Sequence, residues 1–215
     1  CNLDNRSTVV LASYFLDRMC TSEFPNQVAK KGFFYKDNFA WEKDLKAGNQ
    51  HNETGNLYPT VDDVDIALFS GHGFKAYDLA RHYFPHNSMH FYTCNFLNEA
   101  DKDRYQLMQG IHMVLGYGST MYIEPVAAWD FADRLRQGQK FIDAFVGSSY
   151  KYMYPRMDTD ANGNKLIVSI LTAEKSYTDI LFDYSSKPKK YGSDERYLQV
   201  DYKFKKGGRK YEKKM

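Results

Sequence analysis

The chain has 215 residues, of which 43% are hydrophobic and 26% are charged. This is the composition of a globular protein with a full core, and it excludes a collagen-like or low-complexity chain. The 18 Tyr, 15 Phe and 2 Trp also exclude disorder over most of the length, because disordered chains are poor in aromatic residues. No run of 18 apolar residues occurs, so the sequence predicts no membrane-spanning helix.

The charges are unevenly distributed along the chain. The net charge is +2, yet the segment from Lys187 onward holds 11 basic and 4 acidic residues, which leaves a net charge of −5 for the rest. A nucleic-acid-binding domain usually spreads its basic surface over the fold, so we expect no nucleic-acid partner. We interpret the basic segment as a solvated extension, and binding to a membrane surface or an acidic partner remains the alternative.

Three cysteines occur, at Cys1, Cys20 and Cys94. An odd and small number excludes a disulfide-rich scaffold, so at least one thiol is expected to be unpaired. A bacterial lipoprotein begins with a cysteine once its signal peptide is removed, and a trimmed chain would look the same. We therefore expect either an extracytoplasmic protein with a lipid anchor at Cys1 or a cytoplasmic one.

The N-terminal third carries weaker signals than the middle of the chain. Residues 7–16 are apolar and partly β-branched, which predicts a first strand. Residues 22–31 and 39–47 have helical composition. Residues 48–60 are polar and contain two Gly and one Pro, so we expect a loop there.

The middle of the chain alternates between two kinds of pattern. Short apolar runs bounded by turn residues predict strands over residues 64–70, 88–93, 111–117 and 165–173. Helices are expected between them over residues 76–84, 99–109 and 127–152, the last with Gly138 as a weak point. Alternating strands and helices predict an α/β fold, a three-layer sandwich whose mostly parallel central sheet is flanked by helices on both faces.

No internal repeat or linker divides the chain. We expect one domain over residues 1–186, followed by the basic extension of residues 187–215, which could belong to the same domain.

The most informative pattern pairs a histidine with a cysteine. His72 stands between two glycines after the strand of residues 64–70, and Cys94 follows the strand of residues 88–93. The carboxyl ends of neighbouring parallel strands meet at one edge of the sheet, where ligands bind. A thiolate is a strong nucleophile and an imidazole can activate it or protonate a leaving amine, while the backbone amides of Gly73 and Cys94 could hold an oxyanion. The alternative is a cysteine that only packs in the core.

Several stretches resemble a known family. "ALFSGHG" followed by "HFYTCNF" resembles the signature of the caspase-like cysteine peptidases of clan CD, a group that includes caspases, metacaspases, legumains, gingipains, clostripain and separases. "DNFAWEKDLK", "VDDVDIALFSGHG" and "GIHMVLGYGS" resemble an uncharacterised prokaryotic caspase-like family that is named only as a domain of unknown function. "FADRLRQGQKFIDAF" is similar to the helix after the catalytic strand in caspase-like CHAT domains, so the resemblance spans residues 34–150.

The resemblance implies a caspase-like sandwich with cysteine endopeptidase activity. Cys94 would be the nucleophile, His72 the general acid and base, and the backbone amides of Gly73 and Cys94 the oxyanion hole, with no cofactor needed for the chemistry. Metacaspases place an acidic and a small residue before their cysteine, whereas Tyr92 and Thr93 stand here. A specificity for the residue at the cleaved position therefore does not transfer.

A second candidate site lies between the last predicted helix and strand. Asp158, Asp160, Asn162 and Asn164 place oxygen ligands at alternate positions around Gly163, which fits the first seven positions of a calcium loop. The twelfth position is a serine instead of the bidentate glutamate, so Glu174 or Asp179 would have to substitute for it. The alternative is a polar turn held by an aspartate side chain.

Other motifs are weak. The segment after residue 115 lacks the lysine of a phosphate-binding loop, and no serine-hydrolase elbow occurs. The histidines have no zinc-ligand spacing, and His112, in a predicted strand, is interpreted as a core or edge residue.

Taken together, the sequence predicts a cysteine endopeptidase that acts on a peptide or protein through a thioester intermediate. Two alternatives remain open. One is a catalytically inactive caspase-like binding module, and the other is a calcium-binding cell-surface domain whose functional site is the turn that begins at Asp158.

Overall fold

The computed structural model describes the sheet, the helices packed on it and most of the loops in the C-terminal half. The described residues are 5–20, 66–70, 88–92, 94–98, 102–108, 111–183, 185, 194–206 and 208–214. The elements expected over residues 22–31, 39–47, 48–60 and 76–84 lie outside them. No helix in these ranges is long and apolar enough to cross a membrane.

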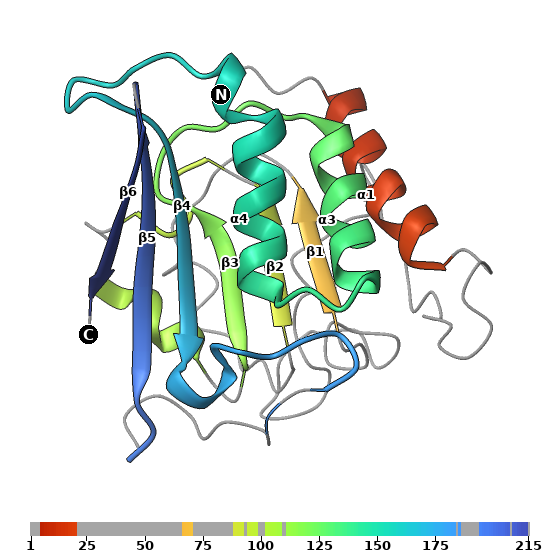
Figure 1. Ribbon diagram of the computed structural model, residues 1–215, viewed down its shortest axis with the longest axis vertical. Helices are drawn as coiled ribbons and strands as arrows, with labels where there is room; N and C mark the ends of the chain where they lie inside the picture. The colour runs from red at the N-terminus through yellow and green to blue at the C-terminus, as the bar shows by residue number, and fades with distance from the viewer. Residues whose placement is uncertain are drawn as a thin grey trace, which may run out of the picture.

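Six strands form one sheet in the order in which they occur along the chain (Figure 1). They are β1 (Ile66–Ser70), β2 (Ser88–Tyr92), β3 (Met113–Tyr117), β4 (Asn164–Ala173), β5 (Tyr197–Lys205) and β6 (Gly208–Lys214). The first three are parallel, whereas β4, β5 and β6 each run antiparallel to the strand before them. The expectation of a mostly parallel sheet is therefore wrong. Only two residues separate β5 from β6, and a connection that short can join antiparallel strands only.

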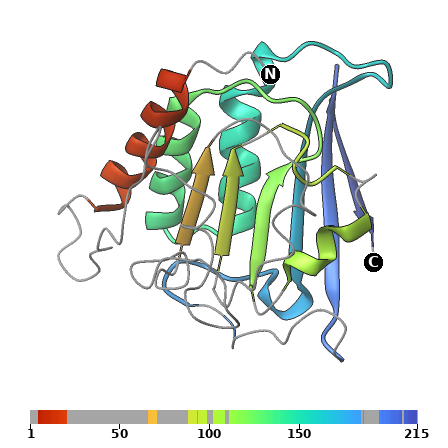
Figure 2. The ribbon, with the colours of Figure 1, turned by 180° about the vertical axis from the view of Figure 1, so that it is seen from behind.

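The expected sandwich is wrong in its layers too. The α-helices of the described residues are α1 (Asn5–Cys20), α3 (Pro125–Arg136) and α4 (Phe141–Tyr152), and all three lie on one face of the sheet (Figure 1). The opposite face carries the short 3-10 helix η4 (Lys102–Leu107), as Figure 2 shows. In the sequence this segment was expected as an α-helix over residues 99–109.

The segment expected as a strand over residues 7–16 is helix α1. Leu11, Phe15 and Met19 are buried and recur at every fourth position, which places them on one helical face. The Phe15 ring stacks on Phe131 of α3, with 5.6 Å between the ring centroids. This period of four outweighs the β-branched residues that favoured a strand.

The long helix expected over residues 127–152 is two helices. Gly138 has a φ of +77°, a left-handed conformation that glycine adopts without strain. Its N–H donates to the Leu135 carbonyl at 3.0 Å and ends α3. The chain then turns back, so that α3 and α4 lie side by side on the sheet (Figure 1).

The segment after Lys187, expected as a basic extension, supplies β5 and β6 to the same sheet. In β5, every second side chain is apolar and packs in the core beneath the helices: Leu198, Val200, Tyr202 and Phe204. The residues between them face the opposite side of the sheet, because side chains alternate along a strand.

Two buried tyrosines lie between the sheet and α4. The rings of Tyr92 and Tyr117 lie 5.5 and 5.3 Å from that of Phe145, between centroids. The Tyr117 hydroxyl shares a hydrogen bond of 2.9 Å with Ser149 Oγ, whereas the Tyr92 hydroxyl has no partner within the described ranges. Burial raises the pKa of both phenols, so both stay neutral at physiological pH.

Because only one of the two hydroxyls has a hydrogen-bond partner, replacing each tyrosine by phenylalanine should have opposite effects on stability. Tyr117→Phe should lower the free energy of unfolding by about 1 kcal/mol, because Ser149 loses its partner. Tyr92→Phe should raise it by about 1 kcal/mol, because it removes a buried hydroxyl that makes no hydrogen bond. Urea unfolding of both variants measures the two effects, and equal destabilisation would contradict the assignment of the unpartnered hydroxyl.

Candidate functional site

The two strands that precede the predicted dyad are direct neighbours. β1 and β2 pair in parallel, and the last residues of the two strands, Ser70 and Tyr92, are partners in the register. Both strands therefore end at the same edge of the sheet. Cys94 follows Tyr92 by two residues, as His72 follows Ser70 by two in the sequence. His72 and Gly73 themselves lie outside the described residues.

Cys94 lies in a tight, buried turn at this edge. Its side chain is only 6% exposed, and the backbone N–H of Met121 donates to its Sγ at 3.4 Å. The sulfur is disulfide-bonded, whereas Cys20 is not in a disulfide. A disulfide sulfur has no thiolate lone pair to offer, so Cys94 can act as a nucleophile only after reduction.

The residue after Cys94 has an unusual backbone conformation. Asn95 has a φ of 56°, in the left-handed region that asparagine tolerates better than most residues. Its N–H donates to the Ser119 carbonyl at 3.0 Å, and the N–H of Leu97 donates to the Tyr117 backbone carbonyl at 3.2 Å. These bonds fasten the turn after β2 across the end of β3.

A cleft of about 710 Å³ opens beside this turn. Its floor is the sheet face opposite the α-helices, where Ile167 and Ser169 of β4 pair with Lys203 and Asp201 of β5. One wall is formed by Asn95, Asn98 and the segment that follows β3, and the other by the segment from Arg156 to Asn164. The cleft therefore adjoins Cys94 through Asn95 and Met121.

Gly118 keeps this floor open. A Cβ at this position would lie 2.6 Å from Ser169 Oγ and 3.1 Å from a methyl group of Ile167. Any side chain at position 118 would therefore collide with the floor.

The predicted calcium residues lie along this cleft, but Asp160 is turned toward its own backbone. Its Oδ1 accepts the N–H groups of Asn162 and Asn164 at 2.9 and 2.7 Å, and its Oδ2 accepts the Asn164 side-chain amide at 3.2 Å. Desolvation alone would raise the pKa of Asp160, but these bonds and the charge of Lys205 outweigh it and lower the pKa. Gly163 has a φ of +78°, as the sharp turn requires.

This geometry is the polar turn that the sequence left open as the alternative to a calcium loop. The described part of the chain holds no group of three or more His, Cys, Asp or Glu residues that could bind a metal ion. Neither of the two suggested replacement ligands can serve this turn, because Asp179 and Glu174 follow β4 and lie at the opposite end of β3. Calcium binding by Asp158, Asp160, Asn162 and Asn164 stays a prediction.

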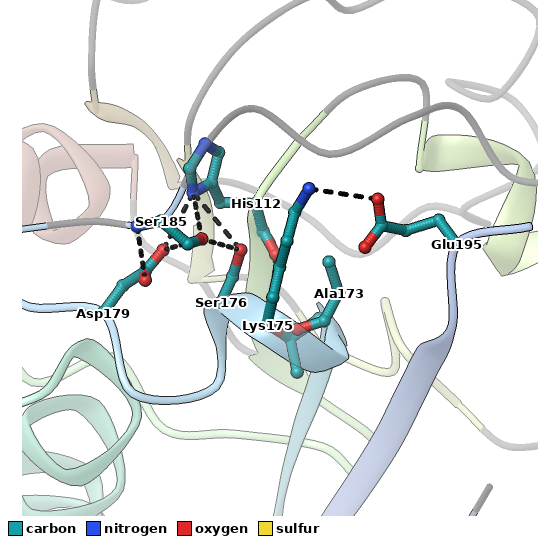
Figure 3. Close-up of polar contacts among 8 residues, drawn as sticks. His112, Ala173, Lys175, Ser176, Asp179, Ser185 and Glu195 are labelled. Carbon is teal, nitrogen blue, oxygen red and sulfur yellow. Dashed lines mark hydrogen bonds and ion pairs between the residues drawn. The ribbon is translucent and has the colours of Figure 1, made fainter.

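A second polar cluster lies at that opposite end, around His112 (Figure 3). His112 Nδ1 lies 2.8 Å from Asp179 Oδ2, and both side chains are less than 5% exposed. Ser185 donates its N–H to Asp179 Oδ1 at 2.9 Å and its hydroxyl to Oδ2 at 3.2 Å. Ser176 Oγ lies 3.3 Å from the same His112 nitrogen and 2.8 Å from Ser185 Oγ.

The cluster resembles a Ser-His-Asp triad in composition but not in geometry. In such a triad the carboxylate and the serine occupy different nitrogens of the imidazole. Here Asp179 and both serines gather at Nδ1 of His112. We therefore interpret it as a structural clamp. It holds the loop after β4 against the start of β3, and the burial of His112 agrees with its interpretation as a core or edge residue.

One family profile matches most of the chain. The profile of DUF6345, described as a domain of unknown function, matches residues 17–194. The chain belongs to the DUF6345 family. No curated protein and no solved structure matches it. The DUF6345 match includes β1 to β4 and Cys94, and it ends just before β5.

Sequence reasoning missed part of the DUF6345 cleft. Asp201 and Ser169 were not proposed as site residues, although the alternation in β5 places Asp201 opposite the apolar side chains. The alternation of apolar residues is visible in the sequence, but it points to Asp201 only once residues 197–205 are recognised as a strand.

The clamp predicts a large stability effect at Asp179 in this DUF6345 chain. Asp179→Ala should lower the free energy of unfolding by about 3 kcal/mol, because buried His112 and Ser185 both lose their bonds to its carboxylate. Asp183→Ala, at an exposed position of the same loop, should change it by about 0.5 kcal/mol or less. Chemical denaturation of the two variants makes the comparison, and similar values would rule out the clamp.

Proposed function

We propose that this chain is a cysteine peptidase in which Cys94 is the nucleophile and His72 the general acid and base. The observation that carries the proposal is the parallel, in-register pairing of β1 with β2, which end together at Ser70 and Tyr92. Each dyad residue follows its strand end by two positions. The resemblance of both motifs to caspase-like peptidases adds support. The proposal rests on the dyad and not on the expected sandwich, which was wrong.

The proposed reaction needs only the dyad and backbone amides. The Cys94 thiolate attacks the carbonyl carbon of the scissile peptide, and the charge on the carbonyl oxygen is held by the N–H groups of Gly73 and Cys94. The C–N bond then breaks as His72 gives a proton to the leaving amine. Water attacks the resulting thioester, with His72 taking its proton, and the acid product leaves.

The disulfide at Cys94 makes this activity conditional. The proposed enzyme is inert while the bond is intact, and a dithiol reductant supplies the two electrons that release the Cys94 thiolate. The backbone N–H of Met121, 3.4 Å from Sγ, would then favour the thiolate by donating to it.

The burial of Cys94 favours a second candidate. A sulfur that is 6% exposed and disulfide-bonded also suits a structural cysteine in a binding module without catalytic activity. The adjoining cleft would then be the functional site, and the turn after β2 would be one of its walls.

Cleavage of a mixed peptide library separates the two candidates. The reduced wild type should cleave peptides, and Cys94→Ala should reduce the rate by about a thousandfold or more. Cys20→Ala is the matched control, since Cys20 is not disulfide-bonded and does not line the cleft, and it should leave the rate unchanged. Each protein is assayed with and without calcium, which also tests the turn at Asp158.

Two further arms sharpen the result. His72→Ala should slow cleavage to a similar extent, and the unreduced wild type should not cleave at all. Reduced, folded wild type that cleaves nothing would overturn the peptidase proposal in favour of the binding module. Cleavage that survives Cys94→Ala would overturn it as well.

A further inference from the structure

The floor of the cleft contains polar atoms that make no hydrogen bond. Ser169 is fully buried, and its Oγ has no partner in the described part of the chain. Asn164 is 7% exposed, and its Oδ1 likewise has none there. Both residues line the cleft. A buried polar atom without a partner costs about 1–3 kcal/mol, so a ligand that supplies a donor would stabilise each of them.

The strand partner of Ser169 is a buried carboxylate. Asp201 is 2% exposed, and Gln199 Nε2 donates to its Oδ1 at 3.2 Å. Gln199 is a neutral amide, and none of the Lys and Arg residues whose side chains the structure describes forms an ion pair with Asp201. A buried charge without a counter-ion is strongly unfavourable. Asp201 and Ser169 therefore form a strip of acceptors across β4 and β5.

The cations that line the same cleft are already engaged. Arg156 pairs with Glu124 and lies over the Tyr122 ring. The ammonium group of Lys165 lies 4.7 Å from the centroid of the Tyr154 ring. Lys203 also has an interaction of its own. The cleft is thus left with unsatisfied acceptors on its floor, whereas the three cations that line it each have an interaction elsewhere.

We infer that the floor of this cleft binds a primary ammonium or guanidinium group, which donates to Ser169 Oγ and pairs with the Asp201 carboxylate. Such a group supplies both features that the floor lacks, a positive charge and several N–H donors. A long cationic side chain or a free alkylamine has the required shape, because its apolar stem can lie along Ile167 while its head reaches the floor.

Binding of a cationic group is inferred from the cleft alone. It bears on the proposed function, but it does not depend on peptidase activity. The cleft adjoins Cys94 through Asn95 and Met121. If the chain is a peptidase, the cationic group would be a basic side chain of the substrate. If the chain is a binding module, the same group could come from a free amine.

Calorimetry on the unreduced protein tests the inference without any cleavage. The probes are butylamine and butylguanidine as free cations, N-acetyl-lysine amide and N-acetyl-arginine amide as peptide side chains, and N-acetyl-norleucine amide as the neutral control. At least one cationic probe should bind at least about tenfold more tightly than the norleucine amide. Preference for the blocked amino acids over the alkyl cations identifies a peptide as the source, and the reverse identifies a free amine.

Substitutions on the floor give a second readout. Asp201→Asn should weaken binding of the cationic probes by about tenfold or more, whereas Asp183→Asn, outside the cleft, should not change it. Ser169→Ala should weaken binding and yet raise the melting temperature of the free protein, because it removes an unsatisfied hydroxyl.

Three results would overturn the inference. They are equal binding of cationic and neutral probes, unchanged binding in Asp201→Asn, and a lower melting temperature in Ser169→Ala. Because no arm requires catalysis, a failed peptidase assay leaves this test intact, and a failed binding test leaves the Cys94 assay intact.

Discussion

The antiparallel pairing of β4 with both β3 and β5 is the interaction on which the rest of the structure depends. β4 joins the parallel strands β1 to β3 to the C-terminal pair β5 and β6. Its apolar side chains Leu166, Val168 and Ile170 pack in the core beneath the helices, while Ile167 and Ser169 form the cleft floor. β4 thus contributes to the core, joins the parallel and antiparallel parts of the sheet, and forms part of the floor of the candidate ligand site.

The sequence predicted what depends on local patterns. Apolar runs ended by turn residues correctly located β1, β2, β3 and β4 to within two residues at each end, and the in-register pairing of β1 with β2 agrees with the expected neighbours. The sequence did not predict the direction of every strand. Alternating strands and helices suggest parallel pairing wherever a long connection joins two strands. The α3–α4 connection is long but returns the chain antiparallel to β3.

Two further errors have the same physical origin, the competition between local propensity and tertiary packing. β-branched residues favoured a strand over residues 7–16, but Leu11, Phe15 and Met19 gain more by packing on α3. Gly138 was correctly seen as a weak point, yet only the packed structure shows that the chain reverses there. For the site, Cys94 could be singled out from sequence, but its burial and its disulfide depend on tertiary packing, and Asp201 lies on β5, which was not recognised.

The place of β6 gives the basic C-terminal segment a different meaning. β6 is the last strand of the sheet among the described residues, and its sequence is GRKYEKK. An exposed edge strand offers unpaired backbone groups to other chains, and natural proteins often protect such edges with lysines. Four of the seven residues of β6 are basic, and charge of this kind would oppose pairing with a second strand of the same sequence.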